Sequence, residues 1–176
     1  MSEIKDALIV VDMQNDFITG CLGTPEARAI VGRVVNKVIK YKQRKRRLFF
    51  THDTHFDDTY LYTHEGKYLP IKHCIYGTLG REIRTEIWNE IPEGAMHINK
   101  SMFGTRRWRK YLGEGIQSVE IVGVCTDICV ISNALMIRSM FPEMDITVDA
   151  SCCAGTTPEK HKSALDVMKS CHIDVI

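Results

Sequence analysis

The sequence predicts a three-layer α/β/α fold around a central, mostly parallel sheet of about five to six strands. Short apolar runs, typical of strands buried on both faces, alternate along the chain with stretches of helical periodicity. The helix start Thr-Pro-Glu occurs twice, at residues 24–26 and 157–159. No repeat or flexible linker divides the 176 residues, so we expect a single domain over residues 1–176.

The first half of the chain is expected to hold two buried strands joined by a long helix. The apolar runs at residues 7–11 and 48–51 predict the strands. The helix begins at the first Thr-Pro-Glu and keeps apolar residues at helical spacing as far as residue 39. Residues 56–79 are polar, aromatic and irregular, and a loop of that length in a compact domain is usually functional.

The second half continues the alternation. Strands are expected at residues 96–99, 119–124, 146–148 and 174–176. Helices are expected at residues 81–88, from a Thr105 cap to residue 112, at 128–140, and from the second Thr-Pro-Glu to about residue 170. In such open parallel sheets, ligands bind outside the carboxyl ends of the strands.

The composition favours a cytoplasmic protein whose main partner is a small molecule. The formal net charge of +1 argues against nucleic acid or a membrane as the main partner, and the basic run at residues 40–47 is interpreted as a solvated helix end. No apolar stretch approaches the ~20 residues of a membrane span, and the chain start lacks a signal-peptide pattern. The seven cysteines are odd in number and scattered, which indicates reduced thiols.

Reactive side chains follow four of the expected strands. Asp12 follows the first strand, Asp53 and His55 the second, Lys100 the third, and Cys129 the run at residues 119–124. A helix start and a nearby lysine would both favour the thiolate form of a cysteine, and a neighbouring carboxylate could accept its proton. Taken alone, Cys129 is more simply explained as a buried thiol, Asp12 as a turn residue and Lys100 as a surface charge. Together they predict a nucleophilic site at one edge of the sheet.

Three segments, VVDMQNDF, INKSMFG and GVCTDICV, resemble in order the motifs of the isochorismatase-like cysteine hydrolases, a family that includes nicotinamidases and N-carbamoyl-amide hydrolases. By that resemblance, Asp12, Lys100 and Cys129 match the catalytic triad. The resemblance also implies a cis peptide bond between Val124 and Cys125, and an oxyanion hole formed by the backbone N–H groups of Cys125 and Cys129. Many members have Ala at the position of Cys125, so a redox role for this second thiol is left open.

A metal site is expected beside these residues. Asp53 and His55 are followed by Glu65 and His73, and carboxylate and imidazole ligands suit Zn, Mn or Fe. Nicotinamidases, by the same resemblance, use an Asp-x-His pair and a later His, often with a fourth ligand from the intervening loop. That ligand is either Glu65 or His64, and Glu65 is preferred because the following GKYLP resembles related sequences with Glu. The alternative is that these are loop residues held by hydrogen bonds.

The resemblance also implies a substrate pocket. Phe17 matches a ring-stacking wall, and Val124 is expected to line the pocket beside the Cys motif. Many nicotinamidases carry an aromatic residue shortly before the Pro-x-His segment, where this chain has Leu69. The preceding Tyr68 is expected to serve instead.

The leading hypothesis is a cysteine-dependent amide hydrolase, similar to nicotinamidases, that converts nicotinamide to nicotinate and ammonia through a thioester. It would use a divalent metal and no organic cofactor, and the family resemblance implies a homo-oligomer. One alternative is another hydrolase of the same family, acting on an N-carbamoyl amide, a ureide or a vinyl ether. A second is a non-enzymatic redox or binding protein that uses the cysteines.

Overall fold

The computed structural model describes residues 6–113 and 115–176, which form a six-stranded sheet in the order β3-β2-β1-β4-β5-β6. The strands are β1 (Asp6–Val11), β2 (Arg47–Asp53), β3 (Met96–Lys100), β4 (Ser118–Val124), β5 (Asp145–Ala154) and β6 (Asp174–Val175). Each neighbouring pair is parallel. The predicted fold class is therefore confirmed. The start of the chain, from which no signal peptide was expected, lies partly outside the described residues.

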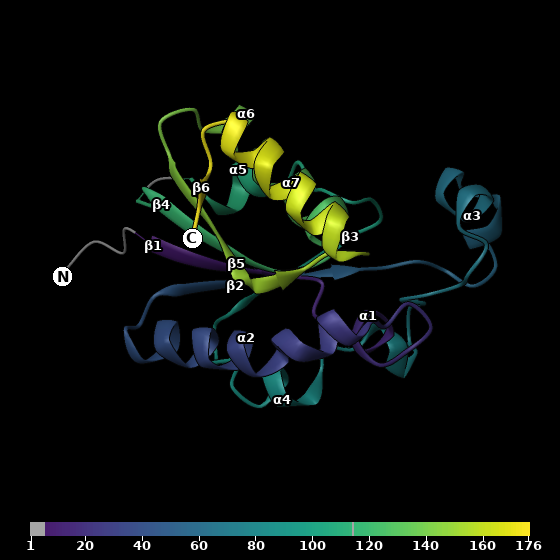
Figure 1. Ribbon diagram of the computed structural model, residues 1–176. Helices are drawn as coiled ribbons and strands as arrows, with labels where there is room; N and C mark the ends of the chain where they lie inside the picture. Colours follow the sequence, from purple (N-terminus) through teal and green to yellow (C-terminus); the bar gives the residue numbers. More distant parts are fainter. Residues whose placement is uncertain (1–5, 114) are drawn as a thin grey trace.

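Helices cover both faces of the sheet (Figure 1). On one face lie α1 (Asn15–Ile18), α2 (Pro25–Gln43) and α4 (Thr85–Trp88), and on the other lie α5 (Trp108–Tyr111), α6 (Ile131–Met140) and α7 (Pro158–Ser170). Both long helices that begin with Thr-Pro-Glu start as predicted. The Thr24 hydroxyl accepts a hydrogen bond from Ala27 N at 3.0 Å, and Thr157 accepts one from Lys160 N at 3.2 Å.

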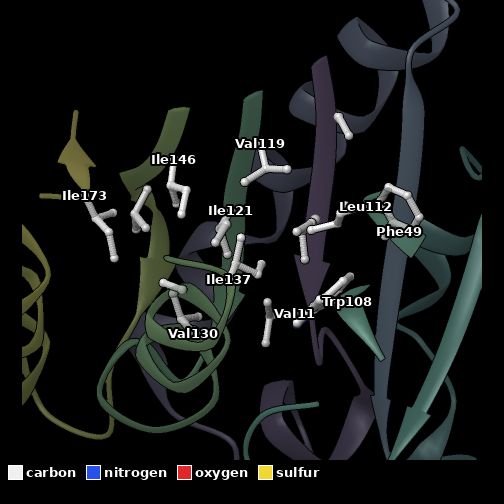
Figure 2. Close-up of a cluster of buried hydrophobic side chains, with 14 of the residues drawn as sticks. Val11, Phe49, Trp108, Leu112, Val119, Ile121, Val130, Ile137, Ile146 and Ile173 are labelled. Carbon is white, nitrogen blue, oxygen red and sulfur yellow. The ribbon is translucent and has the colours of Figure 1, made fainter. Parts of the chain in front are cut away.

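The alternating side chains of the strands divide the apolar interior into two cores. Ile9 and Val11 of β1 face one core, whereas Leu8 and Val10 face the other. Figure 2 shows the first core, where the strands pack against α5 and α6 around the fully buried Trp108. Because helices cover both faces, a central strand must be apolar along its whole length, which is why continuous apolar runs predicted the strands.

Two predicted helices are shorter than expected. The helix expected from Thr105 begins only at Trp108, because Thr105 is buried and its hydroxyl accepts from Arg107 N to hold a turn. The segment expected to be helical at residues 81–88 divides into η2 (Leu79–Arg81) and α4. Ile83 lies between them in an isolated bridge with Gln14, so it adopts an extended conformation.

β5 is longer than its apolar run predicts. It continues through Asp149, whose carboxylate is buried but paired with Lys37 Nζ at 2.7 Å. A paired carboxylate can be buried within a strand at far lower cost than an unpaired one. The basic run at residues 40–47, which includes the last turn of α2, is largely exposed, as expected for a solvated helix end.

The irregular segment expected at residues 56–79 contains two short helices, η1 (Tyr60–Tyr62) and α3 (His64–Tyr68). α3 projects beyond the carboxyl ends of the strands (Figure 1). The segment thus lies at the edge of the sheet where the reactive residues gather. Within the described residues, none of the helices combines the length and apolar character that a bilayer crossing requires.

Candidate active site

The carboxyl ends of four adjacent strands bring the predicted triad together. Asp12 directly follows β1, Lys100 ends β3, and Cys129 lies in η3 (Thr126–Val130), the helical turn that follows β4. Asp53, at the end of β2, lies opposite Lys100 in the β2–β3 ladder. Residues distant in the sequence are thus placed together by strand order and register.

Lys100 is the centre of this cluster. Its Nζ atom lies 2.7 Å from Asp12 Oδ2, 3.5 Å from Cys129 Sγ and 3.4 Å from Asp53 Oδ1. Asp12 is fully buried, and Lys100 and Cys129 are only 5% and 6% exposed. The ammonium therefore touches two carboxylates and a thiol where water is largely excluded.

Burial controls the ionisation of these groups. It raises the pKa of the Cys129 thiol well above its usual value, Lys100 opposes that rise, and Asp12 adds to it. Burial also raises the pKa of Asp12, again opposed by Lys100. Burial alone would lower the pKa of Lys100, but the surrounding anions raise it well above its usual value. Lys100 therefore favours the thiolate, as expected, but burial outweighs the lysine and the net pKa of the thiol is raised.

The turn that carries Cys129 is anchored on both sides. The expected helix over residues 128–140 starts with the wide turn η3 before regular α6. Asn133 Nδ2 donates to Cys129 O at 2.8 Å, and Asp127 accepts hydrogen bonds from the backbone N and the hydroxyl of Thr156 at 2.8 and 2.6 Å. The predicted cis peptide between Val124 and Cys125 is present.

Four predicted metal ligands form a second cluster next to the first. One ligand atom from each of Asp53, His55, Glu65 and His73 lies within 4.8 Å of the others. His55 Nε2 is 2.9 Å from Asp53 Oδ2, and His73 Nε2 is 3.5 Å from Glu65 Oε1. Glu65, rather than its neighbour His64, joins the cluster, in agreement with the preferred alternative.

The residues of this second cluster fit a divalent cation. Two carboxylates and two imidazoles suit Zn, Mn or Fe. His73 Nδ1 is 2.8 Å from Ile71 O, so Nε2 faces the cluster, an orientation typical of metal-binding histidines. Burial would lower the pKa of His73, but Asp53 and Glu65 raise it to about 10. The carboxylates of Asp53 and Glu65 thus stabilise positive charge in this cluster, and a bound metal ion would supply such a charge.

A cavity of about 600 Å³ joins the two clusters. Cys129 lines it, and so do Asp53, Glu65 and His73. Its remaining wall is mainly apolar, formed by Phe17, Leu22, Leu69, Phe103 and Ile128. A volume of this size is ordinary for a small-molecule site.

The cavity includes most of the expected pocket residues. Phe17 and Tyr68 line it, and so does Cys125, which was expected in the oxyanion hole. Val124 does not, because its side chain is fully buried in the core that faces α2. The expectation that Val124 contributes a wall is therefore corrected.

Two polar residues that sequence reasoning missed hold the site in place. Gln14 is fully buried, and its amide clamps Asp53 by donating to Asp53 O and accepting from Asp53 N, both at 2.8 Å. Thr51 is fully buried and hydrogen-bonds Asp12. Gln14 lies in the segment VVDMQNDF, and Thr51 lies in the segment FFTHDTH. A polar residue at a strand end within an apolar run was the available signal.

The site consists of a buried thiol, an ammonium and a carboxylate at the carboxyl edge of a parallel α/β sheet. This arrangement is that of a cysteine hydrolase. The particular family follows from comparison with known proteins. The chain belongs to the isochorismatase family, because residues 6–176 match the Isochorismatase domain.

The similar proteins with the names below support the nicotinamidase-like branch of this family. The chain is 30% identical to a pyrazinamidase of Pyrococcus horikoshii solved in complex with zinc, with a TM-score of 0.86 and 98% of each chain covered. It is 27% identical to a nicotinamidase/pyrazinamidase from Bacillus subtilis, with a TM-score of 0.86, 97% of this chain and 98% of that one being covered. It is 25% identical to a nicotinamidase of Schizosaccharomyces pombe, over 97% of this chain and 92% of the relative.

Proposed function

We propose that this protein is a cysteine-dependent amide hydrolase that converts nicotinamide and water to nicotinate and ammonia. The main support for the proposal is that the cluster around Lys100 and the metal cluster both border the same cavity. Cys129 lines the cavity with its sulfur 3.5 Å from Lys100 Nζ, and three residues of the metal cluster line it as well. Relatives named as nicotinamidases and pyrazinamidases support the choice of substrate.

The first half of the reaction forms a thioester. Asp12 accepts the proton of the Cys129 thiol, and the sulfur attacks the carboxamide carbon. Burial raises the pKa of the thiol, so a base that accepts its proton assists the attack, and general-base assistance contributes typically ~10²–10⁴-fold. The C–N bond then breaks, and Asp12 returns the proton to the departing ammonia.

The second half releases the acid. Asp12, again ionised, accepts a proton from a water molecule whose oxygen attacks the thioester carbon. The C–S bond breaks, the sulfur recovers the proton from Asp12, and the acid leaves and loses its carboxyl proton to solvent as nicotinate. Lys100 stays protonated throughout, because the surrounding anions raise its pKa, and its charge keeps Asp12 ionised between proton transfers.

Backbone N–H groups of Cys125 and Cys129 are proposed to bind the oxyanion of each tetrahedral intermediate. Both residues line the cavity on the same turn. A preorganised donor of this kind is worth about 3–4 kcal/mol in the transition state. Asn133 and Asp127 support the geometry, because they tie this turn to its surroundings.

Asp53, His55, Glu65 and His73 are proposed to hold a divalent Zn, Mn or Fe ion, which would supply a Lewis acid for a ring nitrogen of the substrate. Gln14 fixes the backbone of Asp53, and the His73–Ile71 hydrogen bond fixes the ring of His73. The apolar part of the wall, which includes Phe17 and Phe103, offers apolar area to an aromatic ring.

The cavity wall favours a substrate with an aromatic ring. Phe17 and Phe103 lie in this wall, whereas no lysine or arginine side chain among the described residues does. Positive charge among the lining residues is confined to the metal cluster, where the pKa of His73 is raised to about 10. The apolar part of the wall therefore supports an aromatic amide as the substrate.

The free thiols and the exposed apolar side chains support two further parts of this proposal. All seven cysteines are free, which supports a reducing, cytoplasmic location. Several large apolar side chains of the 56–79 segment are exposed, including Phe56, Tyr62 and Leu79, which supports a homo-oligomer that covers them. Light scattering of the purified protein tests the second statement.

The test of the proposed function is ammonia release from nicotinamide by protein loaded with Zn, Mn or Fe. Wild type should turn over, and Cys129→Ala and Asp12→Asn should each lose at least about 1,000-fold in kcat. Cys171→Ala is the matched control, because that half-exposed thiol lies after α7 and should leave kcat unchanged. Wild type that releases no ammonia with any of the three metals would show that the substrate assignment is wrong.

A further inference from the structure

Thr51 is a fully buried hydroxyl residue near the carboxyl end of β2, and it makes two hydrogen bonds to a single neighbour. Its Oγ1 atom donates to Asp12 Oδ1 at 2.6 Å and accepts from Asp12 N at 3.1 Å. The hydroxyl thus bridges the side chain and the backbone of the same residue. Such a bridge fixes the side-chain torsions of Asp12 relative to its own main chain.

The backbone of Asp12 requires support of this kind. Its φ angle is +49°, in the left-handed region that non-glycine residues rarely adopt. A residue held there persists when its surroundings over-determine the conformation, and such residues gather at functional sites. The hydrogen bond from Asp12 N to Thr51 is one of the contacts that hold it.

The two oxygens of the Asp12 carboxylate have different partners. Oδ1 accepts from Thr51, whereas Oδ2 lies 2.7 Å from Lys100 Nζ. The same Nζ lies 3.5 Å from Cys129 Sγ, so Lys100 links Oδ2 to the thiol. Oδ1 is thereby bound to Thr51 of β2. Oδ2 and the sulfur of Cys129 both lie beside Lys100 Nζ.

We propose that Thr51 is a positioning residue that holds Asp12 Oδ1, so that Oδ2 is the atom that exchanges the proton with Cys129. This inference rests on the proposed function, since it concerns how Asp12 serves as the base. Thr51 itself touches neither substrate nor thiol in this scheme. Its action is entirely through the orientation of the carboxylate.

A purely structural role for Thr51 makes a different prediction. If the hydroxyl only satisfied a buried backbone N–H, its loss would lower stability but leave turnover per folded molecule unchanged. If it orients the carboxylate, its loss lowers kcat at constant substrate affinity. It also slows the reaction of Cys129 with a small alkylating agent, which requires no turnover at all.

The experiment compares Thr51→Val, which keeps the shape without the hydroxyl, with Thr51→Ser, which restores the hydroxyl. For Thr51→Val we expect kcat per folded molecule to fall about 10- to 100-fold with KM changed less than about threefold, since small misplacements of a reacting group cost this much. Thr51→Ser should recover to within about threefold of wild type. Thr147→Val, on β5 away from the site, is the matched control and should retain wild-type kcat.

Alkylation of Cys129 by iodoacetamide separates this inference from the proposed function. In Thr51→Val the rate at pH 7 should fall about tenfold, because the carboxylate that accepts the thiol proton is no longer held in place. If wild type hydrolyses no amide, the function fails while the alkylation comparison still tests Thr51. Unchanged alkylation and kcat in folded Thr51→Val would overturn the positioning role.

Discussion

The ammonium of Lys100 lies 2.7 Å from Oδ2 of Asp12, and the two side chains are 1% and 0% exposed. A pair this deeply buried is costly to form, because both charges lose their hydration. Its Coulombic attraction and the additional contacts to Cys129, Asp53 and Thr51 offset that cost. The pair therefore contributes to both the stability and the chemistry of the site, and the two contributions can be measured separately.

Removing one member of the pair should be worse than removing both. We expect Lys100→Met to lower the free energy of unfolding by about 3–5 kcal/mol at pH 7, because Asp12 is left as a buried charge without its partner. The double variant Lys100→Met/Asp12→Asn should recover at least about 1 kcal/mol of that loss, since Asp12 is then neutral and the remaining carboxylate, Asp53, still has His73 at 3.4 Å. Urea unfolding of the three proteins measures both quantities.

The double variant should be inactive whatever its stability, because it lacks the proposed base. A double variant less stable than Lys100→Met would contradict the view that the unpaired carboxylate causes the loss. Equal stability of Lys100→Met and wild type would show that Asp12 finds compensation elsewhere.

The metal cluster offers a matched pair of neighbouring residues on α3. Glu65 contributes a carboxylate to the cluster, whereas His64 packs against Tyr68, with ring centroids 5.0 Å apart. We expect Glu65→Gln to weaken zinc binding at least about tenfold, since one anionic ligand is lost. His64→Gln should bind zinc as wild type does.

Zinc affinity is measured by competition with a chromophoric chelator, and thermal unfolding gives an independent readout. Zinc at about 100 times its Kd should stabilise wild type by about 2.7 kcal/mol, an increment that EDTA removes. The reverse ranking, with His64→Gln impaired and Glu65→Gln normal, would mean that His64 is the fourth ligand.

A second buried ion-pair group lies away from the site and makes stability depend on pH. Lys37 Nζ is 2.7 Å from Asp149 Oδ2 and 2.6 Å from Glu120 Oε1. Burial would raise the pKa of Asp149, but the hydrogen bonds from Lys37 and Ser151 lower it to about 2, against an ordinary value of 3.8. A carboxyl whose pKa is lower in the folded protein stabilises the fold above its unfolded pKa, and that stabilisation disappears as pH falls toward the folded value.

Asp149→Asn should therefore lower the free energy of unfolding by about 1–2 kcal/mol at pH 7, after allowance for solvent screening. The difference from wild type should be constant down to about pH 4 and shrink between pH 4 and pH 2. Asp166→Asn is the control, because the 4.0 Å pair of Asp166 with Lys169 is more than half exposed, so its effect should stay below about 0.5 kcal/mol. A deficit for Asp149→Asn that grows on acidification would contradict this assignment.

Much of the fold could be predicted because its signals are local. The caps at Thr24 and Thr157, each followed by Pro, start α2 and α7 where predicted, since a cap depends only on residues within one helical turn. The helix predicted from Thr105 was wrong at its start because the turn that Thr105 forms with Arg107 is also held by a contact that is not local. The backbone N of Thr105 donates to Asn133 Oδ1 on α6, 28 positions further along the chain.

The sequence by itself determined the α/β class, the residue types at the strand ends and the family to which they point. Only the tertiary structure decided which of them meet, because contacts across the sheet depend on strand order and register. It brought Glu65 rather than His64 to the metal cluster, and it buried Val124 away from the cavity. It also placed Thr51 against Asp12, which lies 39 positions earlier in the chain but directly after the neighbouring strand β1. The thiol pKa belongs to the same group, because burial is a property of the packed interior and no local pattern encodes it.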